Sequence, residues 1–124
     1  LLASAHAASL VLGVVPYMSA RKLATLYEPL RAELERSLQQ PVTLESAADY
    51  SFFLERTRQG RYDIIATSPY FGRLAQLEQD YQPLARPLAT LAATSMWVLI
   101  STDSIHSALW VSMKPMPPMS AARL

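Results

Sequence analysis

Apolar residues in this chain fall into short continuous runs that alternate with longer stretches of helical spacing. The run "LVLGVV" at residues 10–15 is rich in valine and is typical of a strand buried on both faces. The segments "VTLES" at 42–46, "YDIIAT" at 62–67 and "AATSMWVLIS" at 92–101 predict three further strands. The intervening stretches carry the spacing of amphipathic helices.

The first helical pattern starts after Ser19, a residue type that caps helix N-termini. It predicts a helix over residues 20–39 that Pro41 ends, and Pro29 should kink this helix or divide it in two. The apolar stripe of this helix consists of Leu23, Leu26, Tyr27, Leu30, Leu34 and Leu38. Residues expected on its solvated face include Arg31, Glu33, Glu35 and Arg36.

Two shorter helical patterns follow. One covers residues 50–59 and has Gly60 just past its end. The other starts at Ser68-Pro69, with serine as the N-cap and proline as the first helical residue, and ends near Asp80. The residues expected to face the core are Phe53, Leu54, Thr57, Phe71, Leu74 and Ala75.

Strands and helices therefore alternate, which predicts an α/β fold: an open parallel sheet with helices on both faces and right-handed crossovers. Two such crossovers on opposite faces should place the strand at 10–15 between the strands at 42–46 and 63–67. The segment 82–87 predicts a short strand or an extended link. The last part of the chain predicts a strand around 110–113 followed by a loop.

Composition narrows the class of protein. The chain has 124 residues, of which 51% are hydrophobic and 17% are charged, as expected for one globular domain. A net charge of +1 gives no electrostatic case for binding nucleic acid. Because there is no cysteine, disulfide frameworks and thiolate zinc sites are excluded.

The first residues, "LLASAHAAS", contain Ala5-His6-Ala7, a small-x-small pattern of the kind that signal peptidases recognise. They are interpreted as the remnant of a signal peptide, and an alanine-rich tail is the alternative. No stretch approaches about 18 uninterrupted apolar residues, so no transmembrane helix is predicted.

Three strand-to-helix junctions carry a tyrosine close to a hydroxyl: Pro16-Tyr17-Met18-Ser19, Ala48-Asp49-Tyr50-Ser51 and Thr67-Ser68-Pro69-Tyr70. Open α/β sheets bind ligands at the carboxyl ends of their strands. Helix N-termini favour anions there, hydroxyls add donors, and tyrosine rings line a pocket. The alternative is that Ser19, Asp49 and Ser68 serve only as caps and that the tyrosines cover helix ends.

Other site chemistries find little support. His6 and His106 lie far apart in the sequence, so no metal site is predicted. There is no G-x-S-x-G, phosphate-binding loop or G-x-G-x-x-G, and the chain has only three glycines. The sequence therefore predicts no catalytic residues and no cofactor.

The order and spacing of five segments resemble the amino-terminal part of the periplasmic phosphate/phosphite/phosphonate-binding proteins of ABC transporters. These segments lie within residues 10–103 and read "GVVPY", "LYEPLRAELERSL", "ADYSFFLERTRQGRYDI", "TSPYFGRLAQ" and "YQPLARP". The resemblance implies a two-lobed, type II periplasmic binding protein that closes on its ligand like a hinge. This chain would supply the first lobe.

The resemblance also implies ligand contacts from Tyr50, from Thr67 and Ser68, and from a hydroxyl-rich turn of the second lobe. The counterpart of that turn is Ser120, although Ala121 and Ala122 stand where more hydroxyls are expected. Together with the junction residues, the predicted ligand-binding set is Tyr17, Ser19, Tyr50, Thr67, Ser68, Tyr70 and Ser120.

The expected organisation is a signal-peptide remnant or tail at 1–8, a first α/β lobe at 9–103, and the start of a second lobe or a disrupted end at 104–124. The expected function is that of a periplasmic solute-binding protein, exported by a signal peptide and not an enzyme. It would deliver a small oxyanion or phosphonate-like ligand to the permease of an ABC importer, without binding nucleic acid or spanning the membrane itself. A ligand-sensing extracytoplasmic domain of a signalling protein and an enzyme of the flavodoxin-like type remain as alternatives.

Overall fold

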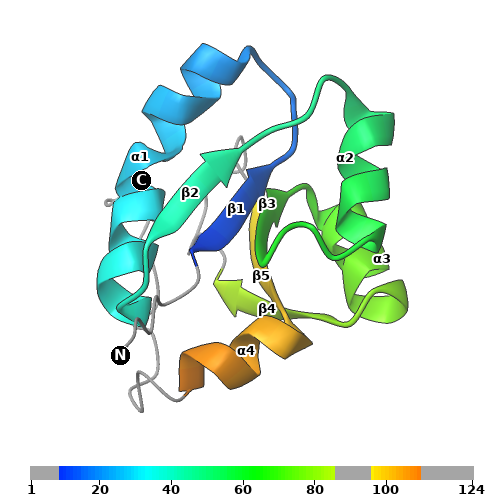
Figure 1. Cartoon of the computed structure of the whole chain (residues 1–124). Helices are drawn as coiled ribbons and strands as arrows, with labels where there is room; N and C mark the ends of the chain where they lie inside the picture. The colour runs from blue at the N-terminus through cyan, green and yellow to red at the C-terminus, as the bar shows by residue number, and fades with distance from the viewer. Residues whose placement is uncertain (1–8, 86–95, 110–124) are drawn as a thin grey trace.

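Five strands form one sheet at the centre of the fold, in the order β2-β1-β3-β5-β4 (Figure 1). A computed structural model describes residues 9–85 and 96–109. The strands are Leu10–Val14 (β1), Val42–Glu45 (β2), Ile64–Thr67 (β3), Tyr81–Ala85 (β4) and Trp97–Ser101 (β5). Because β1 pairs in parallel with both β2 and β3, the predicted place of the first strand between the second and the third is confirmed.

The sheet is mixed rather than wholly parallel. β5 lies between β3 and β4 and is antiparallel to both of them, so the other four strands share one direction. Two consecutive strands can be parallel only if a crossover, usually a helix, carries the chain back to the end where the first strand began. The sequence predicts no helix between β4 and β5. β5 therefore enters the sheet from the opposite end.

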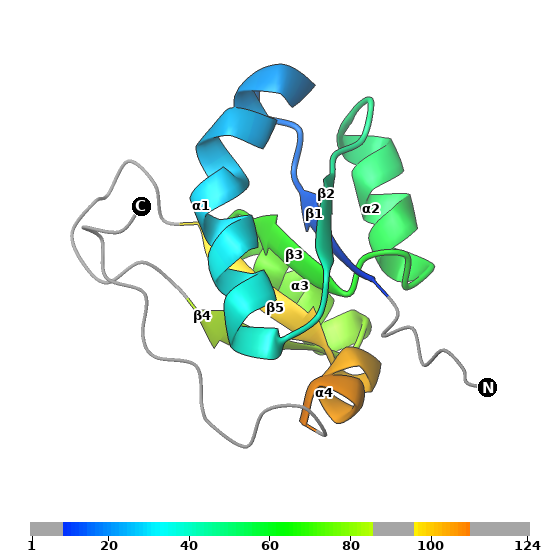
Figure 2. The same cartoon turned by 60° about the vertical axis from the view of Figure 1, so that its left-hand side comes forward.

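Helices cover both faces of this sheet (Figure 2), as the α/β class requires. α1 (Ala20–Leu38) lies on one face, and α2 (Tyr50–Arg58) and α3 (Pro69–Glu78) lie on the other. Side chains along β1 and the residue that follows it point alternately to the two faces of the sheet. Leu12 packs against the leucines of α1, whereas Val15 packs in the core beneath α2 and α3. The predicted α/β architecture is confirmed.

α1 buries most of its predicted stripe, namely Leu23, Leu30, Leu34 and Leu38. Leu26 is exposed, and the expectation for it is wrong because it lies at the margin of the stripe. The helix runs through Pro29 as one element, so it is not divided there. Figure 1 shows the axis of α1 bending along its length.

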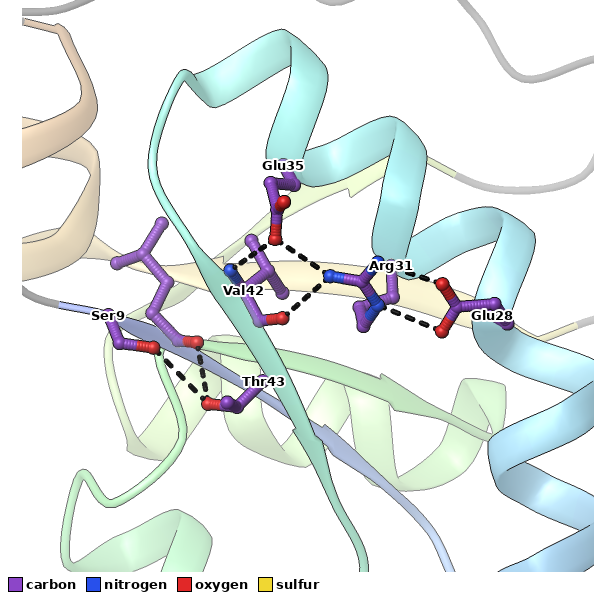
Figure 3. Close-up of polar contacts among 7 residues, drawn as sticks. Ser9, Glu28, Arg31, Glu35, Val42 and Thr43 are labelled. Atoms are coloured by element: carbon purple, nitrogen blue, oxygen red, sulfur yellow. Dashed lines mark hydrogen bonds and ion pairs between the residues drawn. The ribbon is translucent and has the colours of Figure 1, made fainter.

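Two charged residues of α1 fasten this helix to the start of β2 (Figure 3). Arg31 Nη1 donates to Glu35 Oε1 at 2.7 Å and to the carbonyl oxygen of Val42 at 2.9 Å. The Val42 N–H in turn donates to Glu35 Oε1 at 3.0 Å, and Glu28 binds the other side of the guanidinium. We call Arg31, Glu35 and Val42 the helix–strand clamp. The expectation of a purely solvated face is therefore wrong for Arg31 and Glu35.

A fourth helix, α4 (Thr102–Leu109), was not predicted from the sequence. The Ser101 hydroxyl accepts from the Ser104 N–H at 3.2 Å, and the Ser104 hydroxyl donates to Asp63 Oδ1 at 2.7 Å. The other carboxylate oxygen of Asp63 accepts from the Val11 N–H at 2.7 Å, so Asp63 joins β1 to the start of α4. The strand expected around 110–113 lies outside the described residues.

Candidate functional site

The carboxyl ends of β1, β2 and β3 lie at one edge of the sheet because these strands are parallel. Each is followed at that edge by the N-terminus of a helix, and Figure 1 shows the first two connections leaving the sheet on the same side. We call residues 15–22, 46–52 and 67–71 the carboxyl edge. The three junctions singled out from the sequence are therefore brought together.

All three predicted caps form. Ser19 Oγ accepts from the Lys22 N–H at 3.3 Å, and Asp49 Oδ1 accepts from the Phe52 N–H at 2.9 Å. Ser68 Oγ accepts from the Phe71 N–H at 3.4 Å. Each serine hydroxyl keeps a proton that a ligand could accept, whereas a carboxylate has none to offer.

Large apolar side chains are unusually exposed along this edge. Tyr17 is 39% exposed, Tyr50 is 48% exposed and Tyr70 is 68% exposed. Of the seven exposed large apolar side chains in the described residues, five lie within three positions of a cap on the carboxyl edge, namely Tyr17, Met18, Tyr50, Phe52 and Tyr70. A concentration of this kind marks a surface that contacts a ligand or another part of a protein.

Two of the three tyrosines belong to one aromatic cluster, which consists of Tyr50, Tyr70 and Phe71. The Tyr50 and Phe71 rings are stacked with centroids 6.2 Å apart, and the Tyr70 and Phe71 rings meet at 67° with centroids 5.3 Å apart. Phe71 was expected to face the core, but it is half-buried and joins the junctions of α2 and α3. It is a residue that the sequence analysis missed as part of the edge.

Tyr17 has a different partner. Its hydroxyl lies 3.0 Å from the hydroxyl of Tyr27 in α1, and the two rings meet edge to face with centroids 6.5 Å apart. Burial, and secondly this hydrogen bond, raise the pKa of Tyr27 far above its ordinary value, so that phenol stays neutral. Tyr27 was expected only as part of the helix stripe.

The remaining predicted residues differ in access. Ser19 is exposed and Ser68 is half-buried, whereas Thr67 is fully buried and its hydroxyl has no hydrogen-bond partner among the described residues. Thr67 lines a small pocket of about 30 Å³ between α2 and α3. Ser120 lies outside the described residues.

The electrostatics of the edge favour an anion. None of the first turns of α1, α2 and α3 contains an acidic residue, although Asp and Glu are generally favoured at that position. The first turn of α1 instead carries Arg21 and Lys22, which form no ion pair with any described residue. The Asp49 carboxylate is the one negative group among the three caps.

Within residues 9–85 and 96–109, no group of three or more acidic or histidine side chains is placed to hold a metal ion. His6 lies outside this part of the chain, and the side chain of His106 is not described. In the same part of the chain, no helix is long and apolar enough to cross a membrane.

Two solved structures have a similar fold. One is PhnD1 from Prochlorococcus marinus in complex with methylphosphonate, with a TM-score of 0.54 and 18% identity over 61% of this chain. The other is a binding protein component of an ABC phosphonate transporter from Pseudomonas aeruginosa, with a TM-score of 0.54 and 16% identity over 69% of this chain. The matched regions cover 28% of each of these proteins, so this chain corresponds to only part of their length.

A search of curated proteins found no match to this chain. The family model described as "ABC transporter, phosphonate, periplasmic substrate-binding protein" matches residues 12–110, which is most of the chain. This confirms the resemblance seen in the sequence. The chain belongs to the family of periplasmic substrate-binding proteins of phosphonate ABC transporters.

Proposed function

We propose that this chain is the first lobe of a binding protein that holds a small oxyanion of the phosphonate type at the carboxyl edge and delivers it to an ABC importer. The observation that carries this proposal is the meeting of three capped helix N-termini at one edge, with no acidic residue in any of their first turns. Free N–H groups and helix dipoles converge on a space where a phosphonate dianion is stabilised.

The side chains of the edge suit the two ends of such a ligand. Ser19 and Ser68 carry hydroxyl protons for phosphonate oxygens, and Tyr17 adds a phenol. The aromatic cluster, with Tyr50 and Tyr70 exposed, offers apolar surface to the carbon substituent. Thr67 is too deeply buried to touch a ligand in this conformation, so its role would be to shape the end of β3.

The proposed division of the chain follows from the same idea. Residues 9–103 would form the first lobe, and 104–124 would be the start of a second lobe or a disrupted end. The first turns of α4 stay with the first lobe, because Ser104 donates to Asp63. Ser120 would face the carboxyl edge from a second lobe. The solved relatives are more than three times as long as the matched region, which leaves room for such a lobe. Export through a signal peptide that ends within residues 1–8 agrees with the periplasmic setting in the family description.

A transport role is preferred to sensing because the family description names a transporter component. The test is a nuclear magnetic resonance titration of the 124-residue chain with methylphosphonate, because this method detects weak binding residue by residue. One lobe alone should bind with a Kd of about 1 mM, roughly −4 kcal/mol. Sulfate at the same ionic strength serves as the control anion.

Amide shifts should concentrate at residues 17–22, 49–52 and 68–71, with much smaller changes around Gly60 at the opposite end of α2. Sulfate should produce weaker shifts at the same positions. The proposal would be abandoned if methylphosphonate at several times this concentration moved no amide of the carboxyl edge, or if its shifts were centred on another surface.

A further inference from the structure

The link between β1 and α1 holds Tyr17 at two points. Its N–H donates to the carbonyl oxygen of Val15 at 2.9 Å, which closes a three-residue turn. Its hydroxyl lies 3.0 Å from that of Tyr27, ten residues further along the chain. The link therefore folds back along α1, and the phenol of Tyr17 has a defined position although its ring is partly exposed.

The hydroxyls of Tyr17 and Tyr27 share one hydrogen bond but carry two protons. Each phenol has one proton to donate and can also accept, and only one of the two protons can lie between the oxygens. Tyr27 is half-buried and forms no other hydrogen bond with a described residue, so its proton has Tyr17 as its available acceptor. When Tyr27 donates, the proton of Tyr17 is free to point away from α1.

We infer that Tyr27 is a positioning residue that turns the Tyr17 hydroxyl into a hydrogen-bond donor for an anion at the carboxyl edge. This inference rests on the proposed function and adds to it a residue outside the edge itself. Burial raises the pKa of Tyr27, so this phenol keeps the proton that it donates. A hydrogen bond received by Tyr17 also strengthens the one it donates, because linked hydrogen bonds polarise one another.

A purely structural role is the competing explanation. The edge-to-face packing of the two rings would persist without either hydroxyl, and it would stabilise the start of α1 whether or not a ligand binds. The two explanations differ in one respect. A positioning role acts only through Tyr17, and so it vanishes when the Tyr17 hydroxyl is absent.

The test is a double-mutant cycle with Tyr27→Phe, Tyr17→Phe and the double variant, titrated with methylphosphonate. Phenylalanine keeps each ring, and Tyr27→Phe should raise Kd about three- to tenfold, the loss expected for one net hydrogen bond. The same change in the Tyr17→Phe background should have almost no effect. Ser37→Ala is the matched control because it removes a hydroxyl from the last turn of α1.

An unchanged Kd for Tyr27→Phe would overturn the inference, and so would an equal loss in both backgrounds. Amide spectra and thermal melts of each variant show whether the fold is intact, so a loss of binding by unfolding is recognised. If the parent chain binds neither methylphosphonate, phosphate nor phosphite, the proposed function fails and the inference falls with it. If the parent binds and the cycle shows no coupling, only the inference fails.

Discussion

The ring of Tyr62 lies against Gly13 so closely that a β-carbon on residue 13 would be 2.4 Å from Cγ of that ring. Tyr62 is fully buried and also stacks on Phe53, with centroids 5.2 Å apart, so its ring has nowhere to move. Gly13 is therefore required in the middle of β1 for space rather than for an unusual backbone angle. The two residues lock β1 to the segment that leads into β3.

Gly13→Ala should accordingly destabilise the fold by about 2 kcal/mol or more, as overpacking of a core does. Removing a glycine from a strand ordinarily has the opposite sign, because glycine costs more conformational entropy on folding. Urea denaturation measures the change. In a Tyr62→Ala background the cost of Gly13→Ala should shrink, and an equal cost in both backgrounds would show that the ring is not its cause.

Tyr50→Ala should weaken methylphosphonate binding about tenfold and lower the stability of the fold by less than about 1 kcal/mol. The reason is that Tyr50 is about half exposed and that, among the described residues, its ring packs against Phe71. Calorimetric titration and thermal melts on the same samples separate the two effects. Leu77→Ala, which removes an exposed apolar side chain near the end of α3, is the control. A collapse of stability without ligand would mean that Tyr50 is a structural residue.

Replacing both Arg21 and Lys22 by glutamine should weaken anion binding at low salt only. Exposed charges act over a Debye length of about 10 Å at 0.1 M salt and about 3 Å at 1 M, so a severalfold loss at low ionic strength should vanish near 1 M. Titrations at the two salt concentrations test this. Arg58→Gln at the far end of α2 is the control, and a loss independent of salt would indicate direct contact instead of attraction at a distance.

The helix–strand clamp should make stability depend on pH. The pKa of Glu35 lies below its ordinary value of 4.5, first because the Val42 N–H donates to the carboxylate and then because of Arg31. A lowered pKa in the folded state stabilises the fold above the ordinary value, and this contribution is lost as the pH falls through the lower folded value. Glu35→Gln should therefore be less stable than the parent at pH 7, with the difference narrowing toward pH 3.

Urea denaturation at several pH values from 7 to 3 measures this difference. A constant gap between the parent and Glu35→Gln across the whole range would show that the carboxylate charge does not matter. Salt should reduce the gap at pH 7 because the clamp is partly exposed to solvent.

Much of the fold could be predicted from the sequence because its first half obeys local rules. Serine and aspartate caps, Pro69 and the leucine spacing mark helix starts and faces, and right-handed crossovers then place β1 between its neighbours. The direction of β5 follows no such local rule, since it depends on which end of the sheet the chain enters. α4 was missed because eight residues carry too little periodicity, and its signal was the Ser101–Ser104 capping pair.

The sequence predicted which residues lie at the candidate site, but it did not predict which side chains contact one another there. Strand ends and caps place Tyr17, Tyr50 and Tyr70 on one edge, whereas their ring partners depend on the path of each link. Helical spacing predicts that Phe71 faces the core. In the structure its ring lies between α2 and α3 and stacks on Tyr50 instead. The Tyr17–Tyr27 contact requires a reversal of the chain after Val15, which residue types alone do not specify.

The insertion of β5 between β3 and β4 also imposes an order of assembly during synthesis of the chain. β2, β1 and β3 complete their mutual pairing with residues made before β4 emerges. β4 is made next, but its described strand neighbour, β5, does not yet exist. Until β5 arrives, one side of β3 and both sides of β4 carry unpaired backbone groups, the state in which strands pair with other chains. A nascent chain that stalls in this interval is therefore exposed to such pairing, and β5 covers the free side of β3 and one side of β4 in a single step.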